Sequence, residues 1–308
     1  MPMLRPLVPL LLAAAAACAG SPAPVGGPVP FCPTGEVEIV APGVVSTAAS
    51  EYNPSLSPDG RTLVFARAER GFENAKIHVS RWTRAGWSEP RPISFTDARH
   101  TDSDPTFSPD GRTLYFISTR PAPGDTTRDL DVWRAERNGD GWSTPERLGV
   151  EVNSPGPELG PTLHDGWLYF GSARRGGAGG LDLNRARAAG TGFEAAETLG
   201  TAINGAGSEG DPELSRDGRT LLFWSDRPGG AGEGDLHLAR RTADGWSAPG
   251  PIAAANSPRF DFTPSISPDG RWLYFASTRT EAPGAPAAVL GGESNIYRIR
   301  LSPSCPAR

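Results

Sequence analysis

The chain has 308 residues, with 38 glycines and 32 prolines against a hydrophobic content of 37%. It carries 30 basic and 35 acidic residues, a net charge of −5, and both signs are spread along its length, so no basic block indicates a nucleic-acid partner. Beyond the N-terminus no apolar run reaches the ~18 residues of a membrane-spanning helix. Many turn-forming residues with moderate apolar content favour a protein of many short strands.

The first 17 residues have the pattern of a secretory signal peptide. Residues 7–17 are apolar but too short to span a bilayer, and small residues follow. The segment ends Ala15-Ala16-Ala17-Cys18, which resembles the lipobox of bacterial lipoproteins, although that family usually carries leucine where Ala15 stands. We therefore expect lipidation at Cys18, with simple cleavage in the alanine run as the alternative. Residues 18–35 then form the lipidated cysteine and a flexible tether.

One pattern recurs five times in the remaining chain. A well-preserved copy is Ser108-Pro109-Asp110-Gly111-Arg112-Thr113-Leu114-Tyr115-Phe116. Pro-Asp-Gly predicts a tight turn, because proline presets φ, aspartate bonds back to the backbone and glycine adopts positive φ. The flanking β-branched and aromatic residues predict strands. Each copy has a proline in its first strand, and these are Pro54, Pro105, Pro161, Pro212 and Pro264, spaced 51, 56, 51 and 52 residues apart.

Each copy continues with a third strand and the start of a fourth. The predicted third strands are Lys76–Ser80, Leu130–Arg134, Leu181–Arg185, Asp235–Arg240 and Asn295–Arg300. The fourth strands begin at Gly86-Trp87, Gly141-Trp142, Gly192-Phe193 and Gly245-Trp246. A repeated four-stranded antiparallel unit of this period is typical of a β-propeller blade. The sequence therefore predicts an all-β fold.

The repeat core, followed by a strand such as Leu130-Asp131-Val132-Trp133, resembles the WD40-like repeat of bacterial TolB-type propellers. The resemblance covers residues 36–301, the predicted propeller domain, and leaves 302–308 as a C-terminal tail. It implies periplasmic protein–protein contacts, with a peptide entering the channel mouth. Paired glycines of the kelch type, Gly176-Gly177 and Gly229-Gly230, occur in only two copies, so kelch is the weaker interpretation.

The fifth copy lacks its fourth strand, while residues 36–40 precede the first copy as an extra strand. We expect residues 36–40 to complete the last blade and close a ring of five blades, with six, as in TolB itself, as the alternative. Cys32 and Cys305 flank the two strand ends that would meet there without a turn. In an exported chain they are expected to form a disulfide, which closes a long loop and is worth about 4–5 kcal/mol.

A carboxylate stands three residues before every repeat proline. These residues are Glu51, Asp102, Glu158, Glu209 and Asp261, and we call them the acid ring. They are candidates for binding a cationic peptide or Ca²⁺ at one mouth of the channel. The structural interpretation is that they pair with arginines four residues beyond the repeat phenylalanine: Arg120, Arg174, Arg227 and Arg279. The first copy has Glu69 there, with Arg67 and Arg70 nearby, so Glu51 is expected to be the free carboxylate. A second pattern lies eight residues before each proline: Ser46, Asp97, Asn153, Asn204 and Asn256.

Signs of catalysis are weak, and we assign no catalytic residue and no confident metal site. His78, His100, His164 and His237 show no metal-ligand spacing, and there is no G-x-S-x-G sequence. Irregular insertions at Pro121–Arg128, Arg174–Gly180 and Thr280–Glu293 are better pointers to function, and we expect them on the face of the acid ring.

The predicted function is that of a non-enzymatic envelope propeller that binds a protein or peptide at the channel mouth. We expect a monomer without cofactor or nucleic-acid partner, touching a membrane only through its lipid anchor. It would be an outer-membrane lipoprotein facing the periplasm, or otherwise a secreted or periplasmic protein. The alternative is a propeller that binds or cleaves polysaccharide with channel carboxylates. A deep cleft with carboxylates lacking arginine partners would favour that alternative, and a channel closed by side chains would favour the binder.

Overall fold

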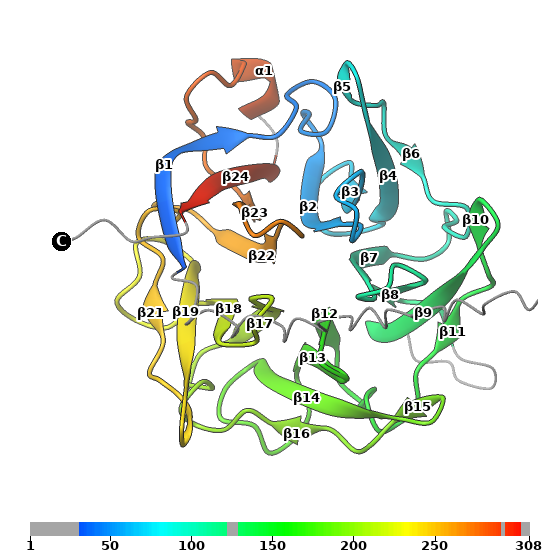
Figure 1. The fold of residues 1–308 in the computed structure, drawn as a ribbon, viewed down its shortest axis with the longest axis vertical. Helices are drawn as coiled ribbons and strands as arrows, with labels where there is room; N and C mark the ends of the chain where they lie inside the picture. Colours follow the sequence, from blue (N-terminus) through cyan, green and yellow to red (C-terminus); the bar gives the residue numbers. More distant parts are fainter. Residues whose placement is uncertain (1–30, 122–128, 291–292, 303–308) are drawn as a thin grey trace, which may run out of the picture.

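The computed structural model describes residues 31–121, 129–290 and 293–302. These residues form five antiparallel sheets arranged in a ring around a central axis (Figure 1). The predicted five-bladed propeller is confirmed, and the six-bladed alternative is wrong.

In each blade the first three strands run outward from the axis in chain order. The innermost strands are β2 (Ser50–Leu56), β7 (Asp102–Phe107), β12 (Glu158–His164), β17 (Glu209–Leu214) and β22 (Asp261–Ile266). The second strands are β3 (Thr62–Ala68), β8 (Thr113–Ser118), β13 (Trp167–Ser172), β18 (Thr220–Ser225) and β23 (Trp272–Ser277). The third strands are β4 (Lys76–Thr83), β9 (Asp131–Asn138), β14 (Asp182–Ala189), β19 (Asp235–Thr242) and β24 (Asn295–Ser302).

The outermost strand of the first four blades is broken into two short pairs. These are β5 (Gly86–Trp87) and β6 (Arg91–Pro92), β10 (Gly141–Trp142) and β11 (Glu146–Arg147), β15 (Gly192–Phe193) and β16 (Glu197–Thr198), and β20 (Gly245–Trp246) and β21 (Gly250–Pro251). Both pieces of a pair bond to the same third strand. One short helix among the described residues, α1 (Ala287–Leu290), lies between β23 and β24.

The ring closes through the N-terminal strand β1 (Cys32–Ile39), which pairs antiparallel with β24 (Figure 1). This confirms the predicted closure, but the strand begins at Cys32 rather than at residue 36, and its register is irregular between Thr34 and Glu38. Cys32 lies opposite Ser302. Its predicted disulfide partner, Cys305, lies outside the described residues.

The repeated turns have the chemistry that their sequence predicts. In the second copy the Asp110 carboxylate accepts hydrogen bonds from the Ser108 hydroxyl at 2.6 Å and from the Arg112 backbone N–H at 3.0 Å. Gly111 takes φ of +70°, as the corner of the turn requires. The shortened third copy turns instead through Asp165 and Gly166, both at positive φ, the geometry of a two-residue hairpin.

Apolar residues of the second and third strands pack between neighbouring blades. The phenylalanine that ends each repeat core has no exposed surface, and the five are Phe65, Phe116, Phe170, Phe223 and Phe275. One inter-blade cluster joins Val64 and Ile77 of the first blade to Leu114, Phe116 and Trp133 of the second. Each blade is thus stabilised by burying apolar surface against the next one.

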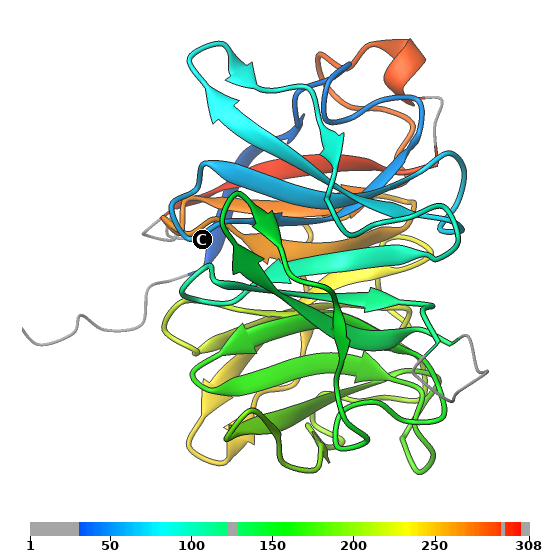
Figure 2. The same cartoon turned by 90° about the vertical axis from the view of Figure 1, so that its right-hand side faces the viewer.

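The propeller has two distinct faces, seen edge-on in Figure 2. The innermost strands begin on one face, which we call the acid-ring face, and the helix α1 lies on it. The Pro-Asp-Gly turns lie on the other, the turn face. Because β24 runs antiparallel to β23 and β1 antiparallel to β24, Ser302 and Cys32 both lie at the turn face.

Candidate functional site

The acid ring lies at the start of the five innermost strands, as predicted, but it is closed to solvent. Glu51, Asp102, Glu158, Glu209 and Asp261 each have a relative exposure of 0%. A buried carboxylate needs a cation or several hydrogen-bond donors to remain in place, because desolvation disfavours its charge. The surroundings of each carboxylate provide both.

An arginine contacts each acid of the ring from its own blade. The nitrogen–oxygen distances are 2.9 Å for Arg67–Glu51, 2.8 Å for Arg120 Nη2–Asp102 Oδ2, 3.7 Å for Arg174–Glu158, 2.8 Å for Arg227–Glu209 and 2.7 Å for Arg279–Asp261. The same guanidinium also donates to a backbone carbonyl in the connection that enters the blade, for example from Arg227 to Ile203 at 2.6 Å. The arginine thereby ties this connection to the second strand.

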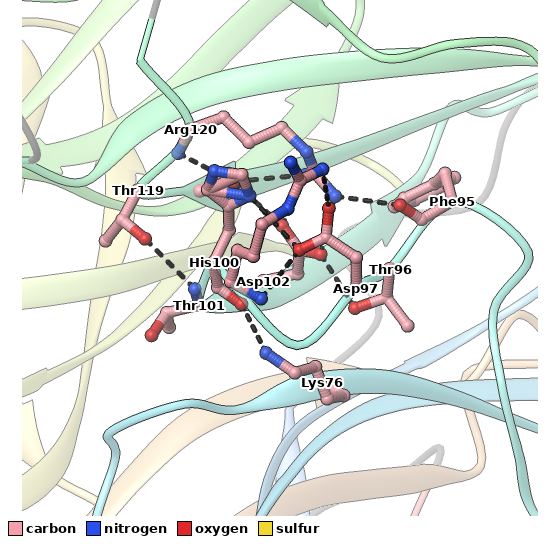
Figure 3. A network of polar contacts seen from close by, with 11 residues as sticks. Lys76, Phe95, Thr96, Asp97, His100, Thr101, Asp102, Thr119 and Arg120 are labelled. Atoms are coloured by element: carbon pink, nitrogen blue, oxygen red, sulfur yellow. Dashed lines mark hydrogen bonds and ion pairs between the residues drawn. The ribbon is translucent and has the colours of Figure 1, made fainter.

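The second blade shows this arrangement in most detail (Figure 3). Arg120 contacts both carboxylate oxygens of Asp102 and donates to the Phe95 carbonyl at 2.9 Å. Hydroxyls complete the shell, with Thr96 donating at 2.7 Å and Ser118 at 2.8 Å. Asp102 therefore has all its acceptor positions occupied by protein groups, which leaves no open side for a ligand.

The first blade corrects the prediction that Glu51 is free. Arg67 lies inside β3, where the other blades carry serine, and its Nε donates to Glu51 at 2.9 Å. Its Nη2 donates to the Val44 and Val45 carbonyls, as the arginines of the other blades do to theirs. The arginine has thus moved two positions along the sequence while keeping its contacts, which a search at fixed spacing misses.

Burial shifts the titration of two acid-ring members. Desolvation raises the pKa of Glu51, against the lowering effects of Thr47 and Arg67. Desolvation also raises the pKa of Glu158 to about 7, because Arg174 remains 3.7 Å away while serine hydroxyls donate most of the hydrogen bonds. Glu158 is therefore the least compensated acid among these five.

The residues eight positions before each repeat proline lie in the segments that connect one blade to the next, and most of them hydrogen-bond to the third strand of the previous blade. The Asn153 side chain accepts from the Val132 N–H at 2.7 Å and donates to the Val132 carbonyl at 3.1 Å, and Asn204 and Asn256 repeat this on Leu183 and Leu236. Ser46 does so on Ile296. Asp97 departs from the pattern and instead contacts His100 (Figure 3). It also accepts a hydrogen bond from Arg99 at 2.9 Å.

The channel is closed midway by residues that sequence reasoning did not single out. The residue before each repeat proline adopts a positive φ of 50° to 55°, and we call these five the channel collar: Asn53, Asp104, Gly160, Asp211 and Thr263. The register of every innermost strand shifts at this position. Proline is tolerated here because the innermost strand has no neighbour on its channel side.

Collar side chains bond from one blade to the next. Asp104 accepts from the Gly160 N–H at 2.9 Å, Thr263 from the Asn53 N–H at 3.2 Å, and Asp211 from the Thr263 N–H. The cavity that remains along the collar is about 40 Å³. On the turn face it widens into a depression of about 660 Å³.

Three carboxylates of the channel have no arginine ion pair among the described residues. Burial raises the pKa of Asp104 to about 6 and that of Glu213 to about 7. It also raises the pKa of Asp211 well above its ordinary value, and the nearby charge of Asp104 adds to this effect. Glu213 bridges two other blades, accepting from Thr162 at 3.1 Å and from the Ile266 N–H at 2.9 Å. These acids act as acceptors between blades.

Other predicted candidates are scattered over the described residues. His78 and His237 lie on third strands and bond to their own strand, through the carbonyls of Lys76 and Asp235. No group of three or more metal-ligating side chains comes together in the described ranges. The insertions at 174–180 and 280–290 lie on the acid-ring face, whereas 122–128 falls outside the described residues.

Comparisons with known proteins identify the fold. Neither a protein-family model nor a curated protein sequence matches the chain. Among solved structures, TolB from Acinetobacter baumannii matches with a TM-score of 0.50 and 14% identity over 82% of this chain, which spans 55% of that protein. A putative TolB from Agrobacterium tumefaciens matches with a TM-score of 0.50 and 19% identity, over 88% of this chain and 91% of the other.

A glycosidase matches equally well. An α-L-arabinofuranosidase from Lactobacillus brevis has a TM-score of 0.53 and 13% identity, over 84% of this chain and 92% of the other. No helix in the described part of the chain is long and apolar enough to cross a membrane. At these identities the likeness concerns architecture rather than activity. The chain is a five-bladed β-propeller with a TolB-like fold. Its architecture is also similar to that of an α-L-arabinofuranosidase.

Proposed function

We propose that this chain is an exported propeller of the cell envelope that binds a protein or peptide partner on its acid-ring face and performs no chemistry itself. The observation that carries the proposal is the closed channel collar. The cavity of about 40 Å³ along the collar is far below the ~300 Å³ of small ligand sites, so a sugar has no room beside Asp104 and Asp211. The acid ring is equally occupied, since its members are buried and contact arginine.

The position of the chain ends supports the choice of face. Cys32 lies at the turn face, so a tether from a lipidated Cys18 would place the membrane on that side. The acid-ring face, with its longer loops, would then point away from the membrane toward a partner. We further propose a signal peptide over residues 1–17, anchoring at the outer membrane, a Cys32–Cys305 disulfide and a monomeric state.

The second candidate is a carbohydrate-binding propeller. It is favoured by a pocket on the acid-ring face that combines aromatic rings with exposed carboxylates, since sugars also stack on aromatic faces. The likeness to arabinofuranosidases concerns the fold alone and does not separate the two candidates.

The test is affinity capture from envelope fractions with the full-length, affinity-tagged protein, analysed for both protein and polysaccharide. We expect a protein partner that is retained after glycosidase treatment and lost after mild proteolysis of the fraction. Capture of polysaccharide without any protein would overturn the proposal. A Cys18→Ser variant serves as the matched control for anchoring, because it should leave the membrane fraction while its purified form still binds the partner.

A further inference from the structure

We infer that the acid-ring face carries a pocket for a basic side chain, arginine or lysine, of the partner polypeptide. This inference rests on the proposed function and names the chemistry that the partner must present. The pocket has a volume of about 380 Å³, enough for one long side chain and its backbone. Its walls are aromatic and its charged residues are acidic. We call it the aromatic pocket, and its lining includes Phe72, Trp224, Phe260, Asp226, Glu233 and Glu293.

The aromatic walls are held in place by one another. Phe72 meets Tyr52 and Phe262 edge-on, with ring centroids 5.0 Å and 5.7 Å apart. Phe260 stacks on Phe262 at 4.5 Å and meets Trp224 edge-on at 5.2 Å. Phe72 nevertheless stays 50% exposed. Exposed aromatic surface that is rigidly positioned and rimmed by polar groups is typical of a recognition site.

The pocket departs from the five-fold repeat, which separates it from features that serve the fold. Trp224 occupies a position that holds Ala66, Ile117, Gly171 and Ala276 in the other blades. Its neighbour Gly210 makes room for it, since a Cβ there would lie 2.4 Å from the indole Nε1. The indole also hydrogen-bonds to Asp211, which fixes the ring against the channel collar.

The charges around the pocket favour a cation. Asp226, Glu233 and Glu293 are exposed, and no basic residue lines the pocket. Two surface arginines approach from outside, Arg259 at 3.8 Å from Glu233 and Arg70 at 4.0 Å from Glu293. Such exposed pairs are weak and exchange readily with a ligand. A guanidinium or ammonium over these rings gains from both the ring faces and the carboxylates. A neutral sugar also stacks on the rings, but its binding does not depend on carboxylate charge.

The test uses two peptides that differ only in charge, acetyl-Gly-Gly-Arg-Gly-Gly-amide and its citrulline counterpart, titrated into the full-length protein. The indole N–H signal of Trp224, assigned by its loss in Trp224→Phe, reports binding by NMR. We expect the arginine peptide to bind about 10-fold more tightly than the citrulline peptide at low salt, within the range of a cation–π contact joined by surface charges. The E233Q/E293Q double variant should reduce this preference, because only the ring faces and Asp226 then favour the charged peptide.

Phe72→Ala should weaken the arginine peptide about 10-fold, whereas Trp82→Ala, which removes an exposed ring on β4, should not change its binding. Equal binding of the two peptides, or a Trp224 response to a neutral oligosaccharide that survives E233Q/E293Q, would overturn the inference. Affinity capture from envelope fractions separates the assignment of the aromatic pocket from the proposed partner-binding function. If Phe72→Ala still captures the partner fully, the pocket assignment fails and the binding function stands. If the unaltered protein captures no protein, the proposed function fails.

Discussion

Arg67 donates to Glu51 from within strand β3, two positions upstream of where the other blades carry the equivalent arginine. Glu51 is completely buried and Arg67 is largely so, with 19% of its side chain exposed. The pair joins the first blade to the connection that arrives from β1, because Arg67 also holds the Val44 and Val45 carbonyls. The contact therefore supports the point at which the ring closes.

We expect Arg67→Met to lower the free energy of unfolding by about 3–5 kcal/mol, because it leaves a buried carboxylate without its cation. Arg70→Met is the matched control, since that side chain is 90% exposed and its loss should cost less than about 0.5 kcal/mol. Urea unfolding followed by tryptophan fluorescence measures both. Equal midpoints for the two variants would contradict the structural role of Arg67.

Glu158 should make the protein less stable as the pH rises. Burial raises its folded-state pKa to about 7, above the ordinary value of 4.5, so the folded state binds the proton more tightly than the unfolded state does. The stabilisation by this proton is fully present below about pH 4.5 and is lost as the pH rises through about 7, at a total cost on the order of 3 kcal/mol. Asp104, with a pKa raised to about 6, adds a contribution of the same sign.

The measurement is the melting temperature at pH 5 and pH 8 for the unaltered protein, Glu158→Gln and the exposed-site control Glu194→Gln. We expect the difference between the two pH values to shrink in Glu158→Gln alone. An unchanged difference in Glu158→Gln would mean that the carboxylate titrates normally.

The sequence predicted the fold because its repeat carries local chemistry. In every copy the turn residues, the strand-forming residues and the apolar pattern predict the same antiparallel unit. The number of blades and the closure by the N-terminal strand could therefore be inferred from the spacing of the copies. The acid ring was visible for the same reason. The arginine partner of Glu51 was missed because Arg67 stands two positions before the site of the arginine in the other blades. Only the contact in the structure shows that Arg67 has the same role.

The channel collar and the aromatic pocket could not be derived from spacing. The sequence shows that Asp104 and Asp211 directly precede repeat prolines. Their hydrogen bonds with Gly160 and Thr263 cross between blades, however, and depend on how closely the innermost strands approach one another. The aromatic pocket gathers Phe72, Trp224 and Phe260 from three blades. A signal existed in Trp224, the largest residue at a position that is otherwise small or aliphatic.

Gly160 shows how tight the collar is. Its φ is +55°, and an added Cβ would lie 2.5 Å from the Cα of Asp211 and 2.3 Å from its Oδ1. Backbone of a neighbouring blade cannot move aside as a flexible side chain can. We therefore expect Gly160→Ala to destabilise the propeller by about 3 kcal/mol or more, combining backbone strain with overpacking.

Gly166→Ala is the control for the strain alone, because Gly166 has φ of +75° with nothing within 4 Å of an added Cβ. It should cost about 1–2 kcal/mol. Chemical unfolding of the two variants side by side measures the difference. If Gly160→Ala proves no worse than Gly166→Ala, the blades are not in close contact at the collar.

Reduction should weaken the closure of the ring. β1 and β24 pair without a covalent turn, and Cys32 lies opposite Ser302, three residues before Cys305 in the sequence. A Cys32–Cys305 disulfide would replace the hairpin that joins the outer strands in the other blades. It would constrain the unfolded chain over nearly the whole propeller, for which chain entropy gives about 4–5 kcal/mol.

We expect a reducing agent to lower the melting temperature of the mature protein by several degrees, and the Cys305→Ser variant to melt at the reduced value with or without the agent. Cys18→Ser controls for the third cysteine and should keep the full response to reduction. A melting temperature that is the same before and after reduction would show that the pairing of β1 with β24 alone closes the propeller.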